Sequence, residues 1–223
     1  MKIALRISRA TLTAVVAAIA ISTLTAPSLH AQWIDRIAVG PSGTWMDAGD
    51  AKSAVGWGLS GVAVITPHIA LQGEVHWFND IEGEIVNLDS TPLALTVQLR
   101  KPSEGISYFV GAGVGYYMLE SDVDLDRAFG PELSDVLQQN NFRAVSDVDD
   151  EIGFHVEIGT EIALLQNLTA QVAARYIWLE ADVEVASDVL ALPTPQGTAL
   201  VYLDDESIDM SGAGMFISLR YSF

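Results

Sequence analysis

Apolar and polar residues alternate along most of this chain with a period of two residues. In the last segment, Met215, Ile217 and Leu219 fall on one side, whereas Ser218 and Arg220 fall on the other. Such a pattern predicts a β-strand with one apolar face. It recurs in eight predicted strands, near residues 36–47, 54–65, 69–79, 92–100, 106–120, 151–164, 169–183 and 211–223.

The connections between the predicted strands differ in length. Residues 66–68, 101–105 and 165–168 form short links, whereas residues 121–150 and 184–210 form long ones. An even strand count, with short turns at one rim and long loops at the other, predicts an all-β, eight-stranded, antiparallel, transmembrane up-and-down β-barrel. Pairing of the first strand with the last leaves no open edge. A membrane requires this, because the backbone groups of an open edge would have no hydrogen-bond partners in lipid. A soluble lipocalin-like barrel is the alternative, and it would enclose the apolar face and expose the arginines.

Aromatic side chains gather near both ends of the predicted apolar face. Amphipathic rings at these positions are typical of the two membrane interfaces. The predicted girdles comprise Trp45, Trp77, Tyr108, Tyr116, Tyr176, Trp178 and Tyr221.

The N-terminal segment has the composition of an export signal. Lys2, Arg6 and Arg9 precede the apolar residues 12–24, and Pro27 leads to the small residue Ala31. This order predicts a cleavable secretory signal peptide over residues 1–31 and a barrel domain over residues 32–223. The chain contains no cysteine, so disulfides cannot stabilise the exported domain.

The polar face of the predicted strands carries arginines and glutamates in near balance. Buried charges are tolerable only when they are paired, so we expect an ion-pair network inside the barrel. A tight turn near Gln166 brings Arg175 opposite or next to Glu157, which predicts the best-defined pair. The predicted network comprises Arg36, Glu74, Arg100, Glu157, Glu161, Arg175 and Arg220.

An inward row of glycines at Gly111, Gly113 and Gly115 leaves room inside the barrel. The row either accommodates bulky neighbours, such as Phe78 or the arginines, or lines a ligand channel. Because eight strands enclose an interior that side chains can fill, packing is the favoured interpretation.

The chain is strongly acidic, and most of the acid lies in or beside the predicted long connections. Removing Lys2, Arg6 and Arg9 from eleven basic residues leaves eight against 29 acidic ones, a formal charge of about -21. Nucleic acid is therefore excluded as a partner. Three alternating carboxylates suggest a divalent-cation site, although without an EF-hand pattern a solvated acidic edge is the favoured alternative. They are Asp122, Asp124 and Asp126.

Two shorter patterns fall within the long connections. Pro131, Leu133, Val136 and Leu137 have the spacing of a short helix with proline at its first position. Two apolar runs flank residues 193–197, and this arrangement predicts a hairpin that projects above the membrane.

Three stretches of the chain resemble a known family. They are residues 108–116, the pair Arg175-Tyr176 and the ending Arg220-Tyr221-Ser222-Phe223. The chain is similar here to the small outer-membrane β-barrel family that includes the OmpA transmembrane domain, OmpX and OmpW. The resemblance implies a monomer in the outer membrane, without a cofactor. It also implies that the barrel assembly machinery recognises the C-terminal residues Leu219, Tyr221 and Phe223.

These observations leave three functions open. The first is a non-enzymatic envelope protein that acts in membrane integrity, surface interaction or limited passage of small solutes, with lipids and lipopolysaccharide as partners, directly or through divalent cations. The second is OmpW-like passage of small hydrophobic molecules through an apolar upper pocket. The third, an enzyme acting on lipid A, is disfavoured because His76 and His155 point inward without a placed nucleophile. The predicted pocket residues are Phe109, Tyr117, Leu119, Ile177 and Leu179.

Overall fold

The computed structural model describes residues 36–223, except for positions 50, 84, 140–141, 143, 188–189, 195–196 and 202–205. The predicted signal peptide and its cleavage after Ala31 therefore lie outside the described residues.

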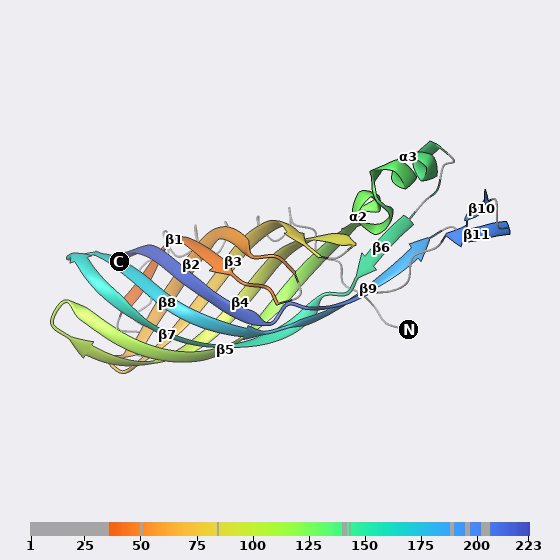
Figure 1. Cartoon of the computed structure of the whole chain (residues 1–223). Helices are drawn as coiled ribbons and strands as arrows, with labels where there is room; N and C mark the ends of the chain where they lie inside the picture. Colours follow the sequence, from red (N-terminus) through yellow and green to blue (C-terminus); the bar gives the residue numbers. More distant parts are fainter. Residues whose placement is uncertain are drawn as a thin grey trace. The chain divides into compact units, whose positions relative to one another are not determined.

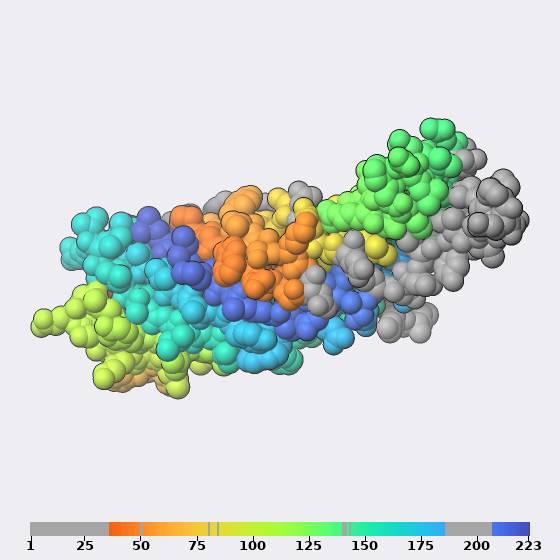
Figure 2. Space-filling view, viewed as in Figure 1, coloured from red at the N-terminus to blue at the C-terminus, as the bar shows by residue number. Residues whose placement is uncertain are grey.

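Eight of the described strands close into an antiparallel barrel, in the order β1-β13-β8-β7-β5-β4-β3-β2 (Figure 1). The ring closes because the first strand pairs with the last, with Ala38 opposite Ser222 and Met46 opposite Gly214. The space-filling view shows this seam, where the side chains of β1 and β2, in orange, lie beside those of β13, in blue (Figure 2). The strands are β1 (Arg36–Met46), β2 (Ala54–Thr66), β3 (Ile69–Glu82), β4 (Val86–Ser103), β5 (Ile106–Val123), β7 (Glu151–Leu165), β8 (Leu168–Trp178) and β13 (Gly212–Ser222).

The two faces of the barrel wall differ as the alternation predicts. On β13, Met215 and Ile217 are 52% and 54% exposed, whereas the neighbouring Arg220 is fully buried. Apolar side chains thus cover the outside and polar ones point into the lumen, which is the arrangement of a membrane-spanning barrel. The predicted fold class is confirmed, and the lipocalin-like alternative, with its faces reversed, is wrong.

The third and fourth strands extend further than predicted. β4 begins at Val86, and β3 reaches Glu82, so a short connection replaces the predicted loop between them. Ile81 and Leu88 are buried and opposite each other, after a register shift that follows Phe78. The alternation continues in this hairpin of β3 and β4 because one of its faces, with Ile81 and Leu88, packs against another layer beyond the barrel.

That layer is a three-stranded sheet of β6 (Ala144–Val148), β9 (Glu180–Ser187) and β12 (Glu206–Asp209), in the order β12-β9-β6. The predicted seventh strand is therefore interrupted at Leu179, whose backbone N–H donates to Ser211 Oγ at 3.0 Å. One face of the sheet, including Val183 and Ile208, joins the largest hydrophobic cluster together with Leu88 from the hairpin. The sequence analysis did not predict this sheet.

Two short helices precede β6. The predicted helix is present as α3 (Pro131–Gln139) and buries Leu137, whereas α2 (Leu125–Phe129) was not predicted. The predicted hairpin is also present, as β10 (Leu190–Thr194) and β11 (Gly197–Val201). Among the described residues, helices are too short or too polar to cross a lipid bilayer.

Candidate functional site in the barrel lumen

Arg175 lies at the centre of the first lumenal cluster. The register of β7 and β8 places it opposite Glu157, and its Nη2 lies 2.7 Å from Glu157 Oε2. Its Nη1 also contacts Glu74, which reaches across the lumen from β3. The guanidinium lies 5.3 Å from the centre of the Phe216 ring, a cation–π distance. The predicted contact with Glu157 is thus present, and Glu74 adds a second carboxylate that the strand order alone did not identify.

Glu161 forms the second cluster, closer to the short turns. Its Oε1 accepts from Arg100 Nη2 at 2.7 Å and from Arg36 Nη2 at 3.0 Å. Its Oε2 accepts from Arg220 Nη2 at 3.2 Å. Three guanidinium groups therefore converge on one carboxylate, and all seven residues of the predicted network take part in one of the two clusters.

Two glutamines, Gln72 and Gln98, connect the two clusters, and a third, Gln171, contacts the second one. Gln98 Nε2 donates to Glu157 Oε1 at 2.8 Å and to Gln72 Oε1 at 2.9 Å. Arg220 Nη1 also donates to Gln72 Oε1, at 3.1 Å, and Arg220 contacts Gln171. The period of two places these amides on the inward face, but it does not show that they join the charged groups.

Each of the two inward histidines contacts a buried hydroxyl group. His76 Nε2 lies 3.0 Å from Ser42 Oγ, and His155 Nε2 lies 2.7 Å from Thr96 Oγ1. All four side chains are buried in the wall or lumen. Ser42 and His76 have the separation of a nucleophile and its base, but both lie inside the barrel.

The glycine row provides space that neighbouring side chains occupy. A Cβ on Gly113 would lie 2.6 Å from His155 Nε2, and one on Gly111 would lie 3.0 Å from Glu157 Cγ. The favoured interpretation, packing, fits these contacts. The neighbours differ from those predicted, because Phe78 instead packs against Gly56.

The predicted apolar pocket is filled with side chains. Tyr117, Leu119, Ile177 and Leu179 belong to the large hydrophobic cluster, which β6, β9 and β12 complete from the long-loop end. Phe109 lies apart from them and packs with Ala173 and Phe216. The five residues therefore fall into two separate clusters, and apolar residues of β9 and β12 pack against the four in the larger one.

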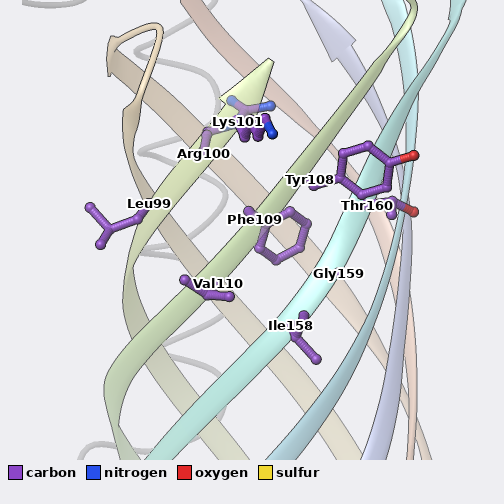
Figure 3. A pocket seen from close by; sticks show the side chains of 9 residues that line it. All are labelled: Leu99, Arg100, Lys101, Tyr108, Phe109, Val110, Ile158, Gly159 and Thr160. Atoms are coloured by element: carbon purple, nitrogen blue, oxygen red, sulfur yellow. The ribbon is translucent and has the colours of Figure 1, made fainter. Parts of the chain in front are cut away.

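A groove of about 520 Å³ lies on the outer wall over β4, β5 and β7 (Figure 3). Its lining includes the outward side chains Leu99, Tyr108 and Ile158. Arg100, Phe109 and Gly159 lie in register across its middle, and the first two of these side chains are buried in the wall. Most of the lining is therefore apolar and faces the lipid.

The predicted girdle residues lie on the outer face. Trp45, Tyr116, Tyr176 and Trp178 are partly exposed toward the long-loop end, and Tyr108 and Tyr221 toward the short-turn end. Trp77 stacks on Trp57 with ring centres 4.7 Å apart, so Trp57 extends the predicted set. Its position in a run of small residues, Gly56-Trp57-Gly58, is the signal that could have identified it.

The C-terminal residues of the predicted assembly signal share this outer face. Leu219, Tyr221 and Phe223 are exposed, and the Phe223 backbone N–H donates to Ile37 O at 3.1 Å across the seam. The last residue is thus part of the closure of the ring.

The three aspartates of the weak metal candidate do not converge. Asp124 instead caps α2, because its Oδ1 accepts from the Arg127 backbone N–H at 3.1 Å and its Oδ2 pairs with Arg127 Nε. Among the described residues, no group of carboxylates and histidines has the arrangement of a metal site. The suggested cation site is therefore wrong, because the helix begins between its members.

The same aspartate belongs to a cluster at the long-loop rim. Glu82, five residues beyond Trp77 in the sequence, pairs with Lys52 and lies 3.5 Å from Arg127. The hydrogen bond from Lys52 holds the pKa of the Glu82 carboxyl below its usual range. This cluster attaches α2 to the ends of the barrel strands.

The barrel is similar in structure to solved outer-membrane proteins. OprG from Pseudomonas aeruginosa matches with a TM-score of 0.63 and 15% identity, over 84% of this chain and 95% of that chain. AlkL, solved in DMPC bilayers, matches with a TM-score of 0.53 and 15% identity, over 89% and 95%. Neisserial surface protein A matches with a TM-score of 0.51 and 10% identity, over 84% and 96%.

No family model matches the chain, and neither does any curated protein at a significant level. At such low identities the structural likeness defines the fold alone. That fold is the small, eight-stranded outer-membrane β-barrel.

Proposed function

We propose that this chain is a non-enzymatic, integral outer-membrane protein that acts through its extracellular surface and not through its lumen. One observation carries the proposal: large side chains fill the lumen at several levels. Arg220 and Phe216 are both fully buried, and Gln72 and Gln98 are at most 1% exposed. Hydrogen-bonded charges hold these side chains in place, so a path for solutes would require several buried contacts to break together.

The surface beyond the barrel supports a role in envelope contact. On β9, Glu180, Asp182 and Glu184 are exposed, while the alternate residues are buried. In the register, Asp147 lies opposite Glu184, and Asp209 lies opposite Glu180. This face presents carboxylates that divalent cations can bridge to anionic lipopolysaccharide. The partners that we propose are therefore lipopolysaccharide and lipids, with a monomeric barrel that the assembly machinery inserts.

The test of the sealed lumen is conductance in planar lipid bilayers. We expect the purified barrel to give no stable channels, whereas the double substitution Phe216→Gly with Arg220→Ala, which removes two fully buried side chains, gives measurable ones. Circular dichroism checks that the variant keeps its strands. Stable channels in the unmodified protein, equal to those of the variant, would contradict the proposal.

Passage of small hydrophobic molecules is the second candidate. The observation that favours it is the apolar layer above the ion pairs, which includes Tyr117 and Ile177. Such molecules would have to displace the side chains that fill this layer. A fluorescent hydrophobic probe tests the idea: Ile177→Ala would raise its uptake into vesicles if the layer is an entry, and leave it unchanged if the layer is only a core.

Catalysis is the third candidate, and we infer that the chain has none. The pair of Ser42 and His76 lies inside the barrel, whereas a lipid substrate would approach from outside. An assay for lipid A modification by the purified protein tests this inference, and any turnover that Ser42→Ala abolishes would contradict it.

A further inference from the structure

The short-turn end of the lumen carries more positive charge than its contacts neutralise. Arg36, Arg100 and Arg220 all pair with the single carboxylate of Glu161. Formal charges therefore leave this cluster with a surplus of two positive charges. The neighbouring cluster, in which Arg175 pairs with Glu74 and Glu157, has a surplus of one negative charge and offsets only part of it.

Buried polar atoms around the same cluster also lack partners. Among the described residues, neither Arg100 Nε nor Arg220 Nε has a hydrogen-bond partner, and the same holds for Gln171 Nε2. The hydroxyl groups of Thr169 and Ser222 are also buried without a hydrogen-bond partner. These five residues are at least nine-tenths buried, and a buried polar group without a hydrogen-bond partner destabilises the fold.

The strand registers bring these groups to one end of the barrel. Thr169 lies opposite Arg220 on the paired strands β8 and β13, and Ser222 is the last residue of β13. Arg100 and Arg220 are held together by their shared contacts with Glu161. The polar groups without partners therefore lie at the same end of the lumen as the positive surplus.

Access is possible at this end, because the Arg36 side chain is 37% exposed while it contacts Glu161. The other two arginines of the cluster are nearly or fully buried behind it. An incoming anion would contact Arg36 first. It would then exchange its hydration shell for hydrogen bonds from Arg100 and Arg220. Guanidinium groups bind oxyanions through paired N–H donors, which makes phosphate a better fit than a spherical ion.

We propose that the short-turn end of the lumen binds one small oxyanion, of which inorganic phosphate is the simplest example. Arg36 admits it, Arg100 and Arg220 provide the charge, and the side chains of β8 provide neutral hydrogen bonds. Bound there, the anion neutralises the surplus charge and satisfies donors that the protein alone leaves without partners. The proposal does not depend on the role of the extracellular surface.

The test is isothermal titration calorimetry of the full mature protein in uncharged detergent, with inorganic phosphate as the probe at constant ionic strength. We expect saturable binding of one phosphate per barrel. Arg36→Gln should weaken it about tenfold, because one charge-assisted contact is lost at a partly exposed position. Thr169→Val should also weaken it while keeping the shape of the buried side chain.

The matched control is Lys101→Gln, which removes a positive charge near the same rim from an exposed side chain. It should leave phosphate binding unchanged, and circular dichroism should show the same strand content in every variant. Absence of saturable binding, or equal weakening by Lys101→Gln, would overturn the proposal. Binding seen only with phosphatidylglycerol, and not with free phosphate, would also overturn it. The arginines would then bind lipid headgroups at the rim.

Discussion

Arg175 illustrates how a single residue can connect distant strands through the lumen. It pairs with Glu157 on the adjacent strand and with Glu74, which is 101 residues away in the sequence. The first contact could be predicted, because a tight turn and a period of two place the partners side by side. The second could not, since it depends on how strands face each other across the closed ring.

The unequal sharing in this cluster predicts unequal effects of substitution. Arg175→Ala should lower the free energy of unfolding by about 3–5 kcal/mol, because it leaves two buried carboxylates without their cation. Glu157→Ala should cost less, about 1–3 kcal/mol, because Arg175 keeps Glu74 as a partner. Urea unfolding in lipid vesicles measures both, with the exposed Asp126→Ala as control. An equal cost for the two lumenal variants would refute the shared pairing.

Two glycines in the wall test the packing of the lumen. A Cβ on Gly113 would lie 2.2 Å from the Leu95 carbonyl oxygen, whereas a Cβ on Gly73 would have no atom within 4 Å. Gly113→Ala should therefore destabilise the barrel by about 1–3 kcal/mol, and Gly73→Ala should cost nothing measurable. Thermal unfolding of the two variants checks this, and a stable Gly113→Ala would show that the row has spare room.

At the scale of elements, the barrel strands followed from alternation, but their extensions did not. The continuation of β4 upward to Val86 and the strand β9 carry the same pattern as the membrane-spanning parts. A period of two shows only that the two faces of a strand differ. It does not show whether lipid or another sheet covers the apolar face. The sheet of β6, β9 and β12 therefore could not be separated from loop or barrel by its sequence alone.

The attachment of α2 to the barrel rim should depend on pH. The pKa of Glu82 is lowered by its hydrogen bond with Lys52, so its contribution is present at neutral pH and is lost as the pH falls through that lowered value. As the pH falls below the ordinary carboxyl value of 4.5, the protection factors of the amides of residues 125–129 should decrease. In Glu82→Gln the neutral-pH protection should already be reduced, and pH should change it less. Identical profiles for the two proteins would show that other groups hold the helix.

At the scale of the whole molecule, the fold was predictable and the contents of its upper lumen were not. Strand number, closure and the orientation of both faces followed from alternation and loop lengths. The packing of Leu119 against the cluster that contains Val183 and Ile208 could not be predicted, because the alternation places these two residues at a strand end and in a loop. Whether a barrel holds a cavity depends on such distant covering residues.

The orientation of the wall can be tested by placing a charge at two exposed positions, one on the barrel and one on the sheet beyond it. Ile217→Arg, on the outer face of β13, should lower stability in a bilayer by about 2–4 kcal/mol, because the charge would face hydrocarbon. Val145→Arg, on the exposed face of β6, should have little effect, because that sheet lies beyond the barrel. Unfolding in vesicles compares them, and equal stabilities would contradict a lipid-facing wall.

The seam between β1 and β13 also sets a condition on biosynthesis. Among the strands of the ring, β13 comes last in the sequence and pairs with β1, which comes first, so the ring can close only after all eight strands have been exported. Until then, the edge of β1 that faces β13 in the finished ring has no partner and can pair with another polypeptide.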